Sequence, residues 1–225
     1  MRVGVEIACL VAVPLCLGAC AVAGIEQVAL LSGLVVLASL ALFFAQFERS
    51  RPRLRDTMPI AVLSALAVAG RILFAPLPDV KPVSAIAIIA GASFGRTSGF
   101  MVGALTALVS NFFFGQGPWT PWQMYAWGLV GYLAGVLAQM GWFKRMPVVL
   151  GYGFVAALLY GAILNLWSLI GFFHPQTFAE GLAIYAVAVP LDVLHGVATD
   201  AFLLALYAPW KGKLERIKRK YALAE

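Results

Sequence analysis

Long apolar runs, separated by short stretches that carry charge, proline or glycine, dominate the chain. A run of about 20 apolar residues crosses a bilayer of about 30 Å as an α-helix. The run at 83–94 is too short for this unless it extends through Pro82 or is tilted and covered by its neighbours. The pattern therefore predicts an all-α polytopic membrane protein with about eight spans, at residues 3–22, 27–46, 58–75, 83–94, 98–114, 121–140, 147–172 and 181–209.

Composition supports this class. The chain is 62% hydrophobic and only 12% charged, and its mean hydropathy is +0.91, values far from those of a soluble domain of this length. The motifs GxxxxGK[ST] and HExxH and paired metal-ligand cysteines do not occur in the sequence. We therefore expect no ATPase motor, no catalytic residues, no metal and no cofactor of its own.

Basic residues, which give a net charge of +6, cluster between the apolar runs. With the N-terminus in the cytosol, fourteen of the sixteen lie on the cytosolic side, so the positive-inside rule predicts an even number of spans with both termini cytosolic, in the cell inner (cytoplasmic) membrane. Segments 76–82, 114–121 and 173–180 are then outside. The fourteen residues are Arg2, Arg49, Arg51, Arg53, Arg55, Arg96, Lys144, Arg145, Lys211, Lys213, Arg216, Lys218, Arg219 and Lys220.

Four parts follow from this layout: an N-terminal transmembrane hairpin at 1–47, a basic cytosolic linker at 48–57, a six-helix membrane core at 58–210 and a basic cytosolic tail at 211–225. The segment Leu17-Gly18-Ala19-Cys20 matches a lipobox that precedes a lipidated cysteine. Glu6 interrupts that apolar run and a second span follows directly, which favours a helical hairpin. Cys9, Cys16 and Cys20 lie within this run and indicate no disulfide framework.

The first core helix carries small residues four apart, Ala61, Ala65 and Ala69, a pattern that lets another helix approach closely. The next informative stretch is NFFFGQGPWTPWQ at 111–123, with 71–82 and 128–135 beside it in the pattern. Over residues 58–210 the chain resembles the substrate-binding S components of energy-coupling factor (ECF) vitamin transporters, and it is most similar to a subgroup associated with cobalamin. The hairpin at 1–47 departs from the minimal six-helix pattern.

This resemblance implies a role in an ABC importer. An S component binds a vitamin from the outside and delivers it through a complex with a transmembrane coupling (T) subunit and two ABC ATPases. The resemblance implies that the three alanines dock on the coupling subunit. Ordinary packing within the core is the other use of such a stripe.

Aromatic residues are concentrated on the predicted outer side, where seven of the sixteen residues from 112 to 127 are aromatic. An interfacial aromatic belt accounts for part of this. Trp119 and Trp122 are the better candidates for a pocket wall, because they flank a turn-rich segment that also carries Gln116 and Gln123. Flat walls with a few amides suit cobalamin, a flavin or a deazapurine.

Polar residues within the spans form the rest of the predicted site, because ionisable groups in hydrocarbon are costly and face a cavity or a partner. Arg71 either contacts ligand or extends to lipid head groups. Asp192 and His195 share one helix face, where a helix-to-helix hydrogen bond is the alternative to substrate contact. The candidate substrate-binding residues are Arg71, Lys81, Asn111, Phe114, Gln116, Trp119, Trp122, Gln123, the Tyr125-Ala126 pair, Asn165, Asp192 and His195.

The sequence thus predicts a non-enzymatic S component that binds cobalamin or a related corrinoid, with riboflavin, a queuosine-type compound or pantothenate as alternative ligands. Two alternatives belong to other classes. Gly91-Ala92-Ser93-Phe94-Gly95 matches a nucleophile elbow, so Ser93 and His195 could form an intramembrane serine hydrolase. A membrane scaffold without a ligand is the other.

Overall fold

The computed structural model describes residues 4, 6–8, 10–15, 28–49, 53–221 and 223, and every regular element in that part of the chain is helical. The all-α prediction is therefore confirmed for the described residues. The elements are α2 (Val28–Arg49), α3 (Leu54–Leu73), α4 (Val83–Phe94), α5 (Arg96–Phe114), α6 (Thr120–Gln139), the 3-10 helix η1 (Trp142–Lys144), α7 (Met146–Ser168), the π-helix η2 (Leu169–Phe173) and α8 (Phe178–Lys220).

Four of these segments are long and apolar enough to cross a membrane. Within the described residues they are Leu54–Leu73, Arg96–Phe114, Met146–Phe173 and Phe178–Lys220. The chain is thus a helical protein with membrane-spanning segments. The total of eight spans stays a prediction.

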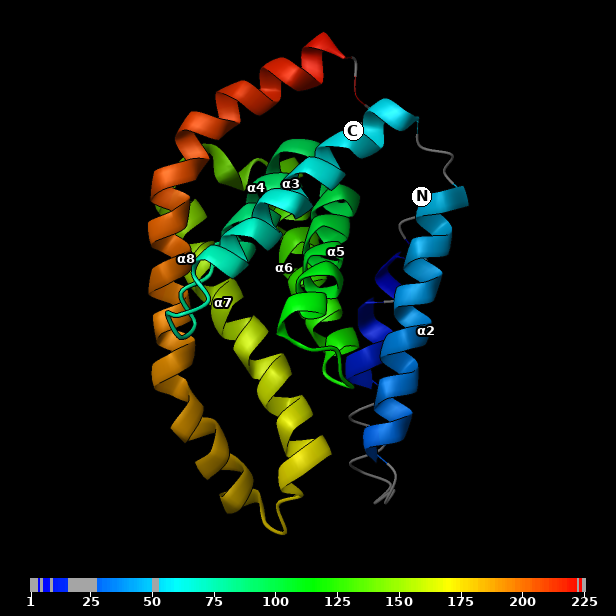
Figure 1. Cartoon of the computed structure of the whole chain (residues 1–225), viewed down its shortest axis with the longest axis vertical. Helices are drawn as coiled ribbons and strands as arrows, with labels where there is room; N and C mark the ends of the chain where they lie inside the picture. The colour runs from blue at the N-terminus through cyan, green and yellow to red at the C-terminus, as the bar shows by residue number, and fades with distance from the viewer. Residues whose placement is uncertain are drawn as a thin grey trace.

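Helices extend beyond the predicted spans at two places. α2 extends to Arg49 and α3 begins at Leu54, so both helices reach into the segment 48–57. The last helix does not end at 209 but continues through Pro209 to Lys220, so most of the predicted tail is helical. A proline removes one backbone hydrogen bond and bends a helix without having to end it. In Figure 1, α8 accordingly turns near its C-terminal quarter, and its last segment crosses above α3.

Local chemistry places the helix ends. At the start of α3, the Asp56 carboxylate accepts a hydrogen bond from the Arg53 backbone N–H at 3.2 Å and pairs with Arg53 Nε at 2.8 Å. The Thr177 side chain caps α8 by accepting from the Glu180 N–H at 3.2 Å. Gly95 separates α4 from α5 with φ of 91°, a left-handed conformation that favours glycine.

Helices α4, α5 and α6 form the most closely packed part of the molecule. Almost every residue of α4 is buried. At the contact between α5 and α6, a Cβ added to Gly131 would lie 2.2 Å from the backbone oxygen of Gly99, so only glycine permits this approach. Backbones that come this close are typical of helix packing within membranes.

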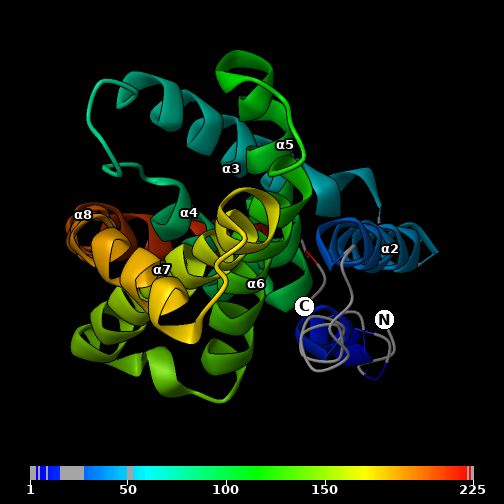
Figure 2. The same cartoon turned by 90° about the horizontal axis from the view of Figure 1, so that it is seen from below.

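The N-terminal segments pack against α5 and α6, while α2 stands beside the bundle in Figure 2. The buried Glu6 carboxylate pairs with Arg96 Nε at 2.7 Å and accepts a hydrogen bond from Tyr132 Oη at 2.9 Å. On α2, Phe43 stacks on Phe100 with ring centroids 3.8 Å apart. The described N-terminal residues thus contact α5 and α6 directly. The predicted lipobox at 17–20 and the three cysteines lie outside the described residues.

Candidate functional site

A polar and aromatic cluster joins the ends of α3, α5 and α6. Arg71, in the last turn of α3, donates from Nη1 to Ser110 Oγ and to Asn111 Oδ1, the latter at 2.8 Å. Its guanidinium carbon lies 4.6 Å from the Phe114 ring centroid and 4.9 Å from that of Trp127. A cation at this distance over two rings is held by cation–π attraction as well as by hydrogen bonds. Arg71 therefore points into the protein and does not extend to lipid head groups.

Asn111 connects this arginine to α6. Its amide nitrogen donates to Thr120 Oγ1 at 2.9 Å and to Gln123 Oε1 at 2.8 Å. The Thr120 hydroxyl in turn donates to Gln116 Oε1 at 3.0 Å. Asn111 is only 1% exposed and uses both amide hydrogens and its oxygen, so its orientation is fully determined by its partners. We call Arg71, Asn111, Gln116, Thr120 and Gln123 the amide cluster.

A second group of contacts extends from the cluster to α4, α7 and α8. Trp127 donates from Nε1 to Ser84 Oγ at 3.2 Å, and the same hydroxyl lies 3.0 Å from His195 Nε2. Tyr160 stacks on Trp127 with a centroid distance of 4.6 Å and meets the edge of His195 at 5.2 Å. These rings form an aromatic wall next to the amide cluster.

Asp192 and Asn165 complete this region. Asn165 Nδ2 donates to Asp192 Oδ2 at 2.9 Å and links α7 to α8. The Tyr160 hydroxyl lies beside Gln123, and the charges of Arg71 and Asp192 act on it. Side chains of α3, α6 and α8 therefore lie close to Tyr160. For Asp192 and His195, the helix-to-helix hydrogen bonds considered from the sequence are present.

The loop between α3 and α4 lies over the same end of the bundle. Lys81 Nζ donates to the carbonyl oxygens of Phe74 and Leu77, both at 2.5 Å, which closes the loop on itself. Asp79 adopts a left-handed φ of 51°. Burial raises the pKa of the Asp79 carboxyl, and the nearby Lys81 charge partly offsets that effect. Burial likewise lowers the pKa of the Lys81 ammonium, opposed by Asp79. Lys81 thus shapes the loop and does not join the amide cluster.

The other predicted aromatic residues lie elsewhere. Trp122 is 1% exposed and stacks on Trp167 at 5.9 Å, so it is a core residue of the α6–α7 contact. Trp119 covers Gly117, where an added Cβ would meet its ring at 2.3 Å. Tyr125 donates its hydroxyl to the Leu10 carbonyl at 2.6 Å and faces the N-terminal helix, and its neighbour Ala126 is fully buried.

Ser93 is not placed with His195. His195 bonds to Ser84, and Ser93 lies nine residues further along α4, which is roughly 13 Å of helix. Ser93 instead lines a polar hollow with Gly95, Gln139 and Lys218. The described residues hold no group of three or more His, Cys, Asp or Glu side chains arranged for a metal ion.

The three alanines of α3 share an outward-facing stripe. Ala61, Ala65 and Ala69 are exposed, whereas Ala67 on the opposite face is completely buried. Packing within the described chain therefore does not use this stripe. It stays open to lipid or to another protein.

Sequence reasoning missed Ser84, Ser110 and Tyr160 as members of this region. Ser110 directly precedes Asn111 on α5, so the two side chains point in different directions around the helix. Both can contact Arg71 only because Arg71 approaches α5 between them. Tyr160 had a recognisable signal, since a tyrosine hydroxyl in the middle of an apolar run needs a hydrogen-bond partner. Its partner on another helix could not be read from the run itself.

A family model described as "Family of unknown function (DUF6580)" matches residues 52–215. The match covers helices α3 to α7 and most of α8, which includes every member of the amide cluster. No curated protein and no solved structure matches the chain.

Proposed function

The chain belongs to the DUF6580 family, and we propose that it is the substrate-binding S component of an ECF-type ABC importer, with cobalamin or a related corrinoid as its ligand. One observation carries the proposal. The amide cluster and the aromatic wall come from separate helices and meet at one end of a six-helix core. Such a combination of flat rings and a few oriented polar groups is typical of sites for organic cofactors.

The chemistry of the cluster fits a broad ligand edged with amides. Asn111 and Gln123 carry side-chain amides, Arg71 carries a fixed cation, and Trp127 and Tyr160 present ring faces. These groups satisfy one another. A ligand amide that inserts between Asn111 and Gln123 can accept from the Asn111 amide nitrogen and donate to Gln123 Oε1, so neither side chain is left unpaired.

Delivery requires a surface for the coupling subunit, and the exposed stripe of Ala61, Ala65 and Ala69 supports this role. Small residues allow a partner helix to approach the α3 backbone closely. Energy would come from the two ATPases of the complex. The protein itself would bind and carry, without chemistry on the substrate.

The proposed orientation places both termini in the cytosol and the amide cluster at the outer side of the inner membrane. In Figure 1 the loop between α7 and α8 lies at the bottom and the basic C-terminal segment of α8 at the top, so the two are at opposite ends of the molecule. Single-cysteine labelling on a background without the three native cysteines tests this. A cysteine at position 52 should resist an impermeant reagent in intact cells, and its labelling would invert the orientation.

Calorimetric titration of the purified chain with cobalamin, riboflavin, a queuosine-type base and pantothenate tests the binding function. We expect one of these to bind, and Arg71→Gln to weaken that binding roughly tenfold or more, because hydrogen bonds to a charged group contribute about 1.5–3 kcal/mol. Arg145→Gln, an exposed arginine in a connection distant in sequence, is the matched control and should bind like wild type. Arg71→Lys, which keeps the charge, guards against misfolding.

Two results would contradict the proposal. The first is that no compound binds to a monodisperse protein. The second is that Arg71→Gln and Arg71→Lys both retain the affinity of wild type, which would show that the amide cluster only packs the helices.

A further inference from the structure

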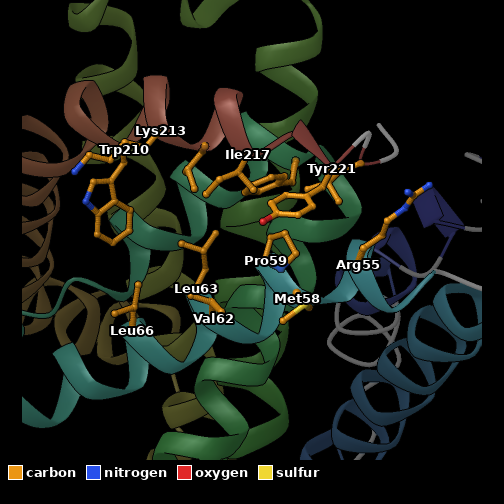
Figure 3. Close-up of a pocket in the computed structure, with 13 residues that line it drawn as sticks. Arg55, Met58, Pro59, Val62, Leu63, Leu66, Trp210, Lys213, Ile217 and Tyr221 are labelled. Carbon is orange, nitrogen blue, oxygen red and sulfur yellow. The ribbon is translucent and has the colours of Figure 1, made fainter. Parts of the chain in front are cut away.

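An apolar groove lies between the N-terminal half of α3 and the end of α8, away from the amide cluster. Its volume is about 390 Å³, comparable to that of small-molecule sites. Figure 3 shows side chains from both helices pointing into it. The walls include Met58, Pro59, Val62 and Leu66 from α3 and Trp210 and Ile217 from α8.

The groove is poorly filled by the protein. Met58 is 59% exposed, Val62 55% and Leu66 46%. In Figure 3, Ile217 approaches from the α8 side without covering them. Exposed apolar side chains on helices that can span a membrane contact lipid, and a groove with such walls has the shape and polarity to hold an acyl chain.

The α8 side of the groove is an amphipathic helix. We call residues 210–220 the C-terminal arm. Trp210, Leu214, Ile217 and Tyr221 are spaced four, three and four residues apart, which puts them on one face. The arm carries six basic residues and one acidic residue, Glu215, so its net charge is 6 − 1 = +5. This composition is typical of helices that lie in the interface of anionic membranes.

Cationic residues are also part of the groove itself. Arg55 lines it from α3 and Lys213 from the C-terminal arm. In Figure 3 the two side chains lie toward opposite ends of the groove. Acidic side chains do not occur among its lining residues within the described part of the chain. The groove is therefore apolar along its length and positive at its ends.

We propose that this groove is a binding site for an anionic phospholipid of the adjacent leaflet. An acyl chain lies along Val62, Leu66 and Ile217, and the phosphate pairs with Lys213 or Arg55. The two basic residues that line the groove select an anionic headgroup over a zwitterionic one, because the choline cation of a zwitterionic lipid would lie beside Lys213 or Arg55. Trp210 and Tyr221 are the residue types that sit at the headgroup level. The site does not depend on which substrate the protein binds.

Native mass spectrometry of the full chain, exchanged into detergent with equal phosphatidylglycerol and phosphatidylcholine, tests the site. We expect preferential retention of phosphatidylglycerol. Arg55→Gln with Lys213→Gln should weaken that retention roughly thirtyfold, as two basic residues are lost. Arg216→Gln with Arg219→Gln removes the same charge from the arm outside the groove lining and should leave retention within about threefold of wild type.

A third variant tests the acyl chain. Val62→Trp fills the groove from an exposed position and should expel the lipid without unfolding the protein, as circular dichroism and monodispersity would show. If the protein retains both lipids equally, or if both double variants lose the same amount of phosphatidylglycerol, binding is only a diffuse attraction between charges. Either result would overturn the proposed site. Unchanged retention in Val62→Trp would overturn the placement of the chain in the groove. If Val62→Trp instead disrupts co-purification of a protein partner while lipid binding persists, the occupant is that partner.

Discussion

Helices α4 to α6 and helices α7 to α8 are buried to very different extents. In α4, ten of twelve residues are buried, whereas in α8 only six of forty-three are. Phe178 and Val187 on α8 are 87% and 80% exposed. In lipid, hydrophobicity does not draw helices together, and close backbone contact does. The glycine contacts of α5 and α6 thus create a rigid half, and the long exposed α8 faces lipid.

The candidate site lies across this division. Arg71, Asn111 and Gln123 belong to α3 and the rigid half, while Asp192 and His195 are on α8. Contacts such as Ser84 with His195 and Trp127 with Tyr160 connect the two halves here. A ligand that entered between them would separate α7 and α8 from a fixed frame. Substitutions in the buried contacts, on α3 and in the loop between α3 and α4 test how the two halves differ.

Trp122→Ala should have the largest effect, because Trp122 is a fully buried contact between the two halves. Removing a large aromatic side chain from a core costs about 3–5 kcal/mol. We expect a strongly lowered thermal midpoint in detergent, with ligand binding lost along with the fold. Trp142→Ala, which removes a 56% exposed indole, is the control. If the Trp122→Ala protein keeps its thermal stability and loses only ligand binding, Trp122 is a ligand-contacting residue and not a core residue.

Gly131→Leu tests the rigid half. The added side chain meets the Gly99 backbone, which cannot move away independently, and overpacking of this kind costs about 1–3 kcal/mol or more. Gly151→Leu is matched to it, since nothing lies within 4 Å of a Cβ at Gly151. Thermal unfolding should separate the two variants clearly. Equal midpoints would mean that α5 and α6 separate easily.

Ala67→Trp and Ala65→Trp compare two faces of α3. Ala67 is completely buried, so its replacement should destabilise the isolated protein by about 1–3 kcal/mol. Ala65 is exposed, so Ala65→Trp should keep stability and ligand affinity but lose uptake in cells and co-purification with a coupling subunit. If Ala65→Trp leaves uptake unchanged, the exposed alanine stripe of α3 has no role in transport.

Asp79→Asn should have the smallest effect. Burial raises the pKa of Asp79 above its unfolded value, so its ionised form is penalised in the folded state. Stability is favoured below the unfolded pKa, about 3.9, and is lost as pH rises through the folded pKa. Asparagine tolerates the left-handed φ and carries no charge. We expect Asp79→Asn to be more stable than wild type at pH 7 by less than about 0.5 kcal/mol.

That difference should vanish below the unfolded pKa, where both side chains are neutral. Thermal midpoints at pH 3.5 and pH 7 measure it. A variant that is less stable at pH 7 would show that the Asp79 charge, paired with Lys81, supports the loop.

The helix positions could be predicted from the sequence because each apolar run ends at residues that stop a helix. Gly95 ends α4, and the Gly115 to Pro118 segment separates α5 from α6. The run at 83–94 became α4 with the same bounds, yet its length alone would have excluded it as a span. Its burial by neighbouring helices compensates for the short length. Helix α8 continues beyond the predicted span 181–209, because a proline such as Pro209 bends a helix without having to end it.

The candidate site could be predicted only in part. Arg71, Asn111 and Gln123 were recognised as polar residues in or next to apolar runs, and the structure brings them together. Trp122 and Gln123 adjoin in sequence but point to different neighbours, since successive residues on a helix are about 100° apart. Which of these two side chains faces α7 depends on how α6 is rotated about its axis in the bundle. The local sequence does not specify that rotation.

The amino-acid sequence was sufficient to predict a helical protein with membrane-spanning segments and the places where its helices lie, because lipid imposes local rules of length and polarity on every segment. The pairing of distant residues was decided only by the tertiary structure. Glu6 looked like an interruption of an apolar run, and it is instead the buried partner of Arg96, ninety residues away. A charge in lipid must find a partner, but which partner it finds depends on the packing of whole helices.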